Sequence, residues 1–220
     1  VTPEEIGFDN ELLYKIDSIV QHAITKKATP GCQILIAKEG KVFFQKSYGY
    51  HTYDKKKEVK NTDIYDLASI TKISATLPML MKMVDEKSLY LDDKLGKYLE
   101  MNTSNKNELI IRDILAHQAK LKSWIPFYAA TLDNDSINGI KVLRDSLYSS
   151  KKSVIYPYKV AKGIYLHFSY PDTIFSIILD SKLNENKKYK YSDLGYYLFQ
   201  RIIEKTYSEK LNILAEDYFY

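Results

Sequence analysis

The amino-acid sequence predicts a fold of the mixed α/β (α+β) class. Three observations support this prediction: an amphipathic helical pattern at residues 9–27, two strand-like runs around a Glu39-Gly40 turn, and mostly helical patterns after about residue 67. We therefore expect an N-terminal helix and β-hairpin at residues 1–66, followed by a mostly helical domain at residues 67–220.

Each expected element has a local signal. In residues 9–27 the apolar side chains share one helical stripe, and Asp9 or Asn10 can cap the helix start. Residues 32–50 read as a hairpin, because Glu39-Gly40 is a turn between two apolar runs. The apolar helix at 69–87 contains Pro78, which we expect to kink or break it.

Later helical patterns cover residues 108–118, with a strand-like entry near Arg112, and residues 191–207, where Ser192 or Asp193 can cap the start. A last amphipathic pattern occupies residues 208–220. Residues 131–190 give weaker signals, and we expect polar loops with short strand-like pieces there.

The composition excludes several classes of protein. Hydrophobic residues make up 45% and charged residues 27% of the 220 residues, which is typical of a globular protein, and no apolar run is long enough to span a bilayer. The net charge is +4 and the pI about 8.8, but the lysines are scattered among acids, so we expect no nucleic-acid partner. A single cysteine, Cys32, allows no intrachain disulfide.

Several kinds of catalytic site are also excluded. The four histidines have no metal-ligand spacing, and neither a glycine-rich phosphate loop nor a G-x-S-x-G elbow occurs, so we expect no metal, no cofactor and no α/β-hydrolase site. His117, in "DILAHQ", is interpreted as a structural residue at a helix end.

The strongest candidate site is the pair Ser69 and Lys72 in "SITK". At positions i and i+3 of a helix the two side chains lie on one face, within reach of each other. A serine needs a base to become a nucleophile, and a lysine can be that base if burial lowers its pKa and keeps it neutral. The apolar flanks, from Leu67 to Leu77, predict such burial. The same spacing at Ser149 and Lys152 has polar surroundings and is interpreted as a solvated loop.

A second candidate element is Tyr191-Ser192-Asp193. A tyrosine just before a helix start could share its proton with Lys72, although Tyr191 could equally be a packing residue and Ser192 or Asp193 only a cap. A similar "SYPD" at residues 169–172 is less attractive, because it opens no clear helix.

Taken together, these segments resemble the serine β-lactamase and penicillin-binding protein superfamily, in its class C-like branch. "DIYDLASITKISATLPMLMKMVDEKSLYLDDKLGKYL" is similar to the nucleophile helix of that family, "LIIRDILAHQAKL" to its "ITIRxLLxHxSGL" segment, and "YKYSDLGYYLF" to its tyrosine motif. The resemblance implies a β-lactamase/transpeptidase-like fold, with an antiparallel sheet flanked by helices and an inserted helical domain. It is greatest to β-lactamase-like domains of Bacteroidetes-type bacteria, which are often fused to a glycoside hydrolase family 3 N-acetylglucosaminidase.

The resemblance also implies roles. Ser69 would be the acylated nucleophile, Lys72 the proton acceptor, Tyr191 the second base, and Asp193 a substrate-binding residue where many members have Asn. A carboxylate beside Lys72 favours the charged ammonium, so we expect Tyr191 to carry more of the base role here. "HQAKL" lacks the glycine of "HxSGL", which we interpret as a structural difference.

The family's third motif, Lys or His before Thr-Gly, is absent, as are the C-terminal strands that complete the family's sheet. We therefore expect a truncated chain that is weakly active or inactive alone. The resemblance further implies a periplasmic or cell-surface location and a fused glycosidase domain.

Two functions remain open. The first is a serine hydrolase that forms an acyl-enzyme on amide, peptide or ester bonds, with a small-molecule β-lactam or a cell-wall peptide as substrate. The alternative is a non-catalytic domain that binds cell-wall ligands or docks to a fused glycosidase.

Overall fold

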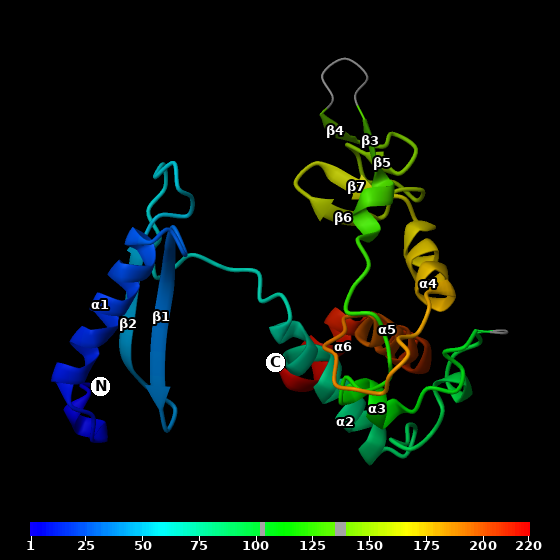
Figure 1. The fold of residues 1–220 in the computed structure, drawn as a ribbon, viewed down its shortest axis with the longest axis horizontal. Helices are drawn as coiled ribbons and strands as arrows, with labels where there is room; N and C mark the ends of the chain where they lie inside the picture. The colour runs from blue at the N-terminus through cyan, green and yellow to red at the C-terminus, as the bar shows by residue number, and fades with distance from the viewer. Residues whose placement is uncertain (102–103, 135–139) are drawn as a thin grey trace. The chain divides into compact units, whose positions relative to one another are not determined.

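A computed structural model describes residues 1–101, 104–134 and 140–220. The chain divides into two compact units, Val1–Leu67 and Ala68–Tyr220, drawn in blue to cyan and in green to red in Figure 1. Both units contain helices and antiparallel strands, so the predicted mixed α/β class is confirmed.

The first unit consists of a helix and a hairpin. After a short 3₁₀ turn, η1 (Glu4–Ile6), helix α1 (Asn10–Thr25) begins at Asp9, whose side chain accepts the Glu11 N–H at 2.8 Å, so Asp9 is the cap. Strands β1 (Gly31–Lys38) and β2 (Lys41–Gly49) pair antiparallel. The turn residues Glu39 and Gly40 both have positive φ, of 51° and 74°, as a two-residue hairpin turn requires.

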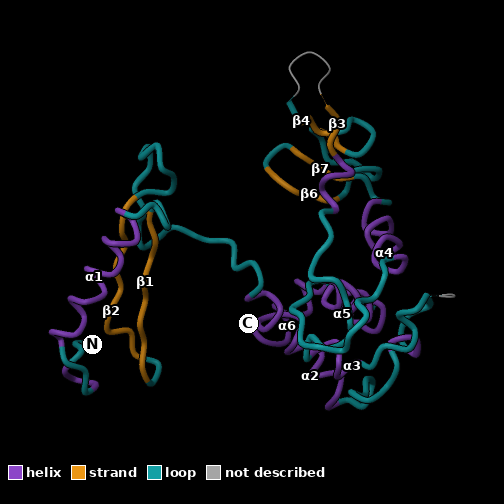
Figure 2. Tube along the Cα trace, in the orientation of Figure 1, coloured by secondary structure: helices purple, strands orange, loops and turns teal. Residues whose placement is uncertain are grey.

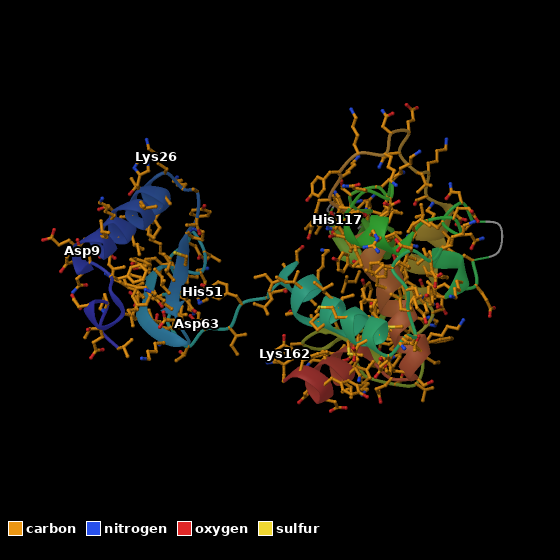
Figure 3. The ribbon with its side chains drawn as sticks, turned by 90° about the horizontal axis from the view of Figure 1, so that it is seen from below. Asp9, Lys26, His51, Asp63, His117 and Lys162 are labelled. Carbon is orange, nitrogen blue, oxygen red and sulfur yellow. The ribbon has the colours of Figure 1, made fainter. Side chains whose placement is uncertain are left out.

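The helix and the hairpin of the first unit are joined through two polar contacts at Asp17 and through aromatic packing. The Tyr48 hydroxyl of β2 donates to Oδ1 of Asp17 in α1 at 2.6 Å, and Lys46 pairs with the same oxygen at 2.8 Å. Phe8 stacks on Phe43 with ring centroids 4.7 Å apart. Figure 3 shows His51 and Asp63 near each other in this unit, where they form a 2.7 Å pair.

The second unit is built on a helical core. Its helices are α2 (Leu77–Asp85), α3 (Ile111–Leu115), α4 (Tyr170–Asp180), α5 (Leu194–Tyr207) and α6 (Leu211–Phe219), with the 3₁₀ turns η3 (Leu95–Lys97) and η4 (Phe127–Thr131) between them. Side chains from all five helices meet in one buried cluster, with Met79, Ile111, Ile178, Phe199 and Leu214 among its members. Figure 2 shows these helices, in purple, gathered in the body of the unit.

The strands of the second unit form two small antiparallel sheets between η4 and α4. Strands β3 (Leu132–Asn134) and β4 (Lys141–Leu143) pair with each other. Strands β5 (Tyr148–Ser149), β7 (Ile164–Leu166) and β6 (Tyr158–Ala161) form a three-stranded sheet in that order. The weak strand signals at residues 131–190 therefore correspond to real but very short strands.

The helix that carries the "SITK" stretch contains a π-helical turn, η2 (Lys72–Thr76), directly before α2. Pro78 lies in the first turn of α2, where its missing N–H is tolerated. The expected kink or break at Pro78 is not a break, because the helical backbone continues from η2 into α2 and only changes from π-helical to α-helical turns. Pro78 offers no N–H to the carbonyl of Ser74, four residues earlier, and the Tyr220 hydroxyl donates to that carbonyl at 2.7 Å.

In the second unit one expectation was wrong, and one buried residue was not predicted. "SYPD" does open a helix, because α4 begins at Tyr170 with Pro171 in its first turn. Lys106 is fully buried, which composition does not predict. Its ammonium donates to Oδ1 of Asn105 at 2.8 Å and to the carbonyls of Leu179 and Ser181 at the end of α4, so the charge is offset by acceptors at a helix C-terminus.

Candidate active site

Ser69 lies at the start of the helix that continues into η2. Its carbonyl accepts the Lys72 N–H at 3.0 Å, which is the first turn of that helix. The preceding residue, Ala68, has φ of 45°, in the left-handed region that non-glycine residues seldom adopt. The backbone is thus bent immediately before Ser69.

Lys72 occupies the centre of the site. Its ammonium donates to Ser69 Oγ at 3.0 Å, as the i and i+3 spacing predicts, and to Asp193 Oδ1 at 2.6 Å. The ammonium also lies over two aromatic rings, 4.9 Å from the centroid of Tyr191 and 5.6 Å from that of Tyr196. Only 14% of the Lys72 side chain is exposed, so one carboxylate and two rings replace most of its water.

Tyr191 completes a triangle with these two residues. Its ring centroid lies 4.9 Å from the Lys72 ammonium, and the side chains of Lys72 and Ser69 both lower the pKa of its hydroxyl. Because Ser69 Oγ accepts a hydrogen bond from Lys72, the hydroxyl hydrogen of Ser69 is left for a second acceptor. The structure therefore brings Ser69, Lys72, Tyr191 and Asp193 together, from two segments more than a hundred residues apart.

The segment that carries Tyr191 is held by the loop after α3. The Ser192 hydroxyl donates to the Lys122 carbonyl at 2.7 Å, and the Asp193 N–H donates to the Ser123 carbonyl at 2.8 Å. The Ser192 oxygen also accepts the Leu194 N–H at 3.2 Å, whereas Asp193 makes no side-chain cap. Ser192 thus accepts the first N–H of α5, and the Asp193 carboxylate is left available to Lys72.

The charges of the site act on Lys72 and Tyr191 in opposite directions. Burial by itself lowers the pKa of Lys72, but hydrogen bonds with Asp193 and Tyr191 outweigh it, and the pKa ends above the ordinary lysine value. Hydrogen bonds from Lys72 and Ser69 lower the pKa of Tyr191. At neutral pH Lys72 is therefore a cation, and the phenol is the group whose deprotonation the site favours.

This result corrects one expectation. The apolar flanks of Ser69 predicted a buried, neutral lysine, but Ser69 is exposed, and so are Ile70 and Ile73, at 53% and 62%. The lysine itself is shielded, yet its nearest partner is a carboxylate. The charge of Lys72 is therefore set by a residue from a distant segment and not by the local apolar sequence.

The cavities of the second unit lie elsewhere. One of about 710 Å³ is lined by residues around η3, and one of about 920 Å³ lies between α4 and α5, lined by Phe175, Tyr197 and Arg201 among others. Ser69, Lys72 and Tyr191 line neither. Ser69 is exposed and Tyr191 is 42% exposed, so both side chains are open to solvent.

The "HQAKL" loop contacts the candidate site. His117 follows the end of α3, as expected, and its ring lies against Tyr191, with centroids 4.5 Å apart. Lys120, where the family pattern has glycine, has φ of 61°. The backbone there keeps the left-handed conformation that glycine adopts most easily, with a lysine in its place.

No group of three or more His, Cys, Asp or Glu side chains within residues 1–101, 104–134 and 140–220 could hold a metal ion. In the same part of the chain no helix has the length and apolar character needed to cross a membrane.

The sequence matches the Beta-lactamase family model over residues 16–220, which is most of its length. The chain belongs to the beta-lactamase family. The resemblance drawn from the "SITK", "HQAKL" and "YSD" segments to the serine β-lactamase and penicillin-binding protein superfamily is thereby confirmed.

Two curated relatives illustrate the family. Protein flp of Staphylococcus aureus (strain MW2) is 36% identical over 146 residues, which cover 63% of this chain and 29% of that protein. N-acetylmuramyl-L-alanine amidase of Bacillus subtilis (strain 168) is 25% identical over 234 aligned positions, which cover 100% of this chain and 46% of that protein. The chain thus spans less than half the length of these relatives.

Solved structures show the same fold. An octameric penicillin-binding protein homologue from Pyrococcus abyssi aligns with a TM-score of 0.65 and 22% identity, over 94% of this chain and 42% of its own. A class C beta lactamase from Rhodobacter sphaeroides gives 0.59 and 16%, over 92% and 46%. FmtA from Staphylococcus aureus gives 0.60 and 20%, over 94% and 47%. The predicted β-lactamase/transpeptidase-like fold is confirmed.

Proposed function

We propose that this chain carries the nucleophile and the proton-transfer residues of a serine hydrolase that acts through an acyl-enzyme. The observation that carries the proposal is the cluster in which the Lys72 ammonium donates to Ser69 Oγ at 3.0 Å and lies 4.9 Å from the centroid of the Tyr191 ring. A serine alone is a poor nucleophile, and a neighbouring acceptor for its proton is what activates it.

Tyr191 is the proton acceptor in this proposal. The Tyr191 phenolate takes the hydrogen of Ser69, and Ser69 Oγ forms a bond to the substrate's acyl carbon. Protonated Tyr191 then returns the hydrogen to the leaving nitrogen or oxygen as its bond to the acyl carbon breaks. In the second half the phenolate takes a proton from water, the hydroxide attacks the acyl carbon, and Ser69 leaves with that proton.

Lys72 remains charged throughout. Its ammonium stabilises the phenolate and donates to Ser69 Oγ, while Asp193 holds it in the charged form. The backbone N–H of Ser69, at the start of a helix, is the proposed donor to the oxyanion that forms on the substrate. Tyr191 therefore carries the base role that the serine–lysine spacing alone would assign to Lys72.

The proposed substrates are amide, peptide or ester bonds of the β-lactam or cell-wall peptide class. Support comes from the beta-lactamase family match and from the amidase and beta-lactamase names of similar proteins. The proposed location is the periplasm or the cell surface, and fusion to a glycosidase domain remains a prediction.

The test is covalent labelling of the whole protein with a fluorescent penicillin and a fluorophosphonate. Ser69→Ala should abolish labelling, and Ser149→Ala is the matched control, because Ser149 has the same spacing to a lysine and lies in β5. Labelling of Ser69→Ala at the wild-type rate would refute the assignment.

The alternative proposal is a non-catalytic domain that binds cell-wall ligands or docks to a fused glycosidase. Asp193 in place of the family's usual Asn is the observation that favours it, because a carboxylate cannot donate a hydrogen bond to a substrate carbonyl. Saturable binding of a muropeptide without a gain of covalent mass would support this alternative over the hydrolase.

A further inference from the structure

His117 contacts the chain on both sides of Tyr191. Its carbonyl accepts the Lys190 N–H at 2.8 Å, and its Nδ1 accepts the Ser192 N–H at 3.2 Å. The two residues that flank Tyr191 are therefore both bonded to one residue of the loop after α3. Figure 3 shows His117 in the second unit, beside the green helix α3.

The backbone of His117 is itself held in place. Its N–H donates to the Ile114 carbonyl at 3.1 Å, which ties it to the end of α3, and its φ is 56°. Ile114 is almost fully buried in the core cluster. The position of His117 is thus fixed by the body of the unit, and the segment around Tyr191 takes its position from His117.

The imidazole ring adds a direct contact. It lies against the Tyr191 ring with centroids 4.5 Å apart and planes tilted by 46°. The Lys72 ammonium is a second neighbour of the Tyr191 ring, 4.9 Å from its centroid. Two neighbours, one neutral ring and one cation, therefore limit where the phenol can turn.

We infer that His117 is a positioning residue that holds the Tyr191 phenol against Lys72 and Ser69 by fixing the chain on either side of it. The catalytic consequence of this inference rests on the proposed function, whereas the structural consequence does not. A nitrogen that accepts a backbone N–H carries no proton, so His117 acts in this way only as the neutral ring protonated on Nε2.

The charged groups around the ring favour that neutral form. Burial lowers the pKa of His117, the Lys72 ammonium lowers it further, and only Asp193 acts in the opposite direction. The remaining titratable neighbours are the phenols of Tyr189, Tyr191 and Tyr196, from the preceding segment and from α5. At neutral pH Nδ1 is therefore free of a proton and accepts the Ser192 N–H.

Two variants separate the roles of the ring and of its nitrogen. His117→Phe keeps an aromatic ring against Tyr191 but leaves the buried Ser192 N–H without its acceptor. His117→Asn loses the ring but places an acceptor oxygen near the position of Nδ1, and Asn tolerates a left-handed backbone. His167→Phe is the matched control, because Nδ1 of His167 accepts the Ser169 N–H at the same 3.2 Å outside the candidate site.

The first readout is the titration of Tyr191 in protein labelled with ¹³Cζ-tyrosine, assigned with Tyr191→Phe. We expect His117→Phe to raise the pKa of Tyr191 toward the ordinary tyrosine value, with His117→Asn and His167→Phe close to wild type. The second readout is labelling by fluorescent penicillin, where His117→Phe should slow acylation about tenfold, as for one buried hydrogen bond, without weakening the initial binding.

The inference is overturned if His117→Phe folds with the wild-type melting temperature and leaves both the Tyr191 titration and the acylation rate unchanged. Should that variant fail to fold, the wild-type protein answers the question. The Ser192 amide resonance of ¹⁵N-labelled protein should shift as His117 is protonated, at a pH below the ordinary histidine pKa, and the ¹³Cζ resonance of Tyr191 should shift over the same pH range. The inference would also be overturned if the Ser192 amide resonance did not shift when His117 is protonated.

These readouts separate the two proposals. If Ser69 is not the nucleophile, Ser69→Ala labels normally while the effect of His117 on the Tyr191 titration persists. If His117 is not a positioning residue, Ser69→Ala still abolishes labelling while the His117 variants titrate like wild type.

Discussion

The Lys72 ammonium and the Asp193 carboxylate form an ion pair with an N–O distance of 2.6 Å, although the two residues are 121 positions apart in the sequence. The lysine comes from the turn that follows the candidate nucleophile, and the carboxylate comes from the N-cap position of α5. This pair determines which group of the site can accept a proton, because it keeps the lysine charged and leaves the phenol as the acceptor.

Asp193→Asn should move the whole pH profile of labelling to lower pH. Asp193 raises the pKa of Lys72 and also raises that of Tyr191, so removing its charge lowers both values. The acid limb, where Tyr191 loses its proton, and the alkaline limb, where Lys72 loses its charge, should then both occur earlier. The measurement is the acylation rate of the whole protein from pH 5 to well above about 10.5, the ordinary lysine pKa, because Lys72 of the wild type loses its charge above that value.

Asp172→Asn is the control for this prediction. Asp172 pairs with Arg201 at the same distance of 2.6 Å, on α4 and α5, and does not contact the candidate site. Its profile should match wild type. A profile of Asp193→Asn that is unshifted, or that shifts to higher pH, would contradict the assigned charge of Lys72.

Tyr191→Phe should slow acylation by about 10²–10⁴-fold, the usual contribution of a general base, with little effect on folding. The variant keeps the ring that lies near Lys72 and against His117, and it removes only the hydroxyl. Stopped-flow labelling and a thermal melt measure the two effects. Tyr189→Phe, which alters a more exposed ring at the edge of His117, should label normally.

Lys120→Gly should stabilise the second unit by about 1 kcal/mol, the cost of placing a side chain in the left-handed region. Lys120 has φ of 61°, and its carbonyl accepts the Asn184 N–H at 2.7 Å, a bond that glycine preserves. Urea denaturation measures the change. Lys122→Gly, two residues further on, has no such strain to relieve and should be destabilising by about 0.5–1 kcal/mol.

Gly195→Ala should destabilise the protein, although alanine is the better helix former by about 1 kcal/mol. A Cβ at position 195 of α5 would lie 2.3 Å from Cγ2 of Ile114, a buried residue of α3. We expect a loss of about 1–3 kcal/mol from this overpacking. Gln200→Ala, on the exposed face of α5, is the control, and equal melting temperatures for the two variants would refute the predicted clash.

Local patterns predicted what depends on neighbouring residues. The Asp9 cap and the Glu39-Gly40 turn both follow from backbone preferences within a few positions. The contact between Ser69 and Lys72 belongs to the same group, because helical spacing alone brings positions i and i+3 together.

What the sequence could not predict depends on long-range packing. No local pattern reports the pairing of Lys72 with Asp193, and only the resemblance to a known family indicated that this carboxylate lies beside the lysine. The burial of Lys106 depends on carbonyls at the end of α4, more than 70 residues away. Strands of two to four residues, such as β5 and β6, are too short to show a periodicity.

The π-helical turn η2 has a consequence for insertions and deletions. A π turn contains one residue more than the matching α turn, and each helical residue advances the chain by about 100°. Deleting Ala75 would let residues 72–76 relax into a regular α-helix while Met79 and Leu80 stay anchored in the core. Ser69 would then rotate by roughly a quarter of a turn away from Tyr191. The number of residues in this short stretch, and not only their identity, therefore determines the direction of the Ser69 hydroxyl.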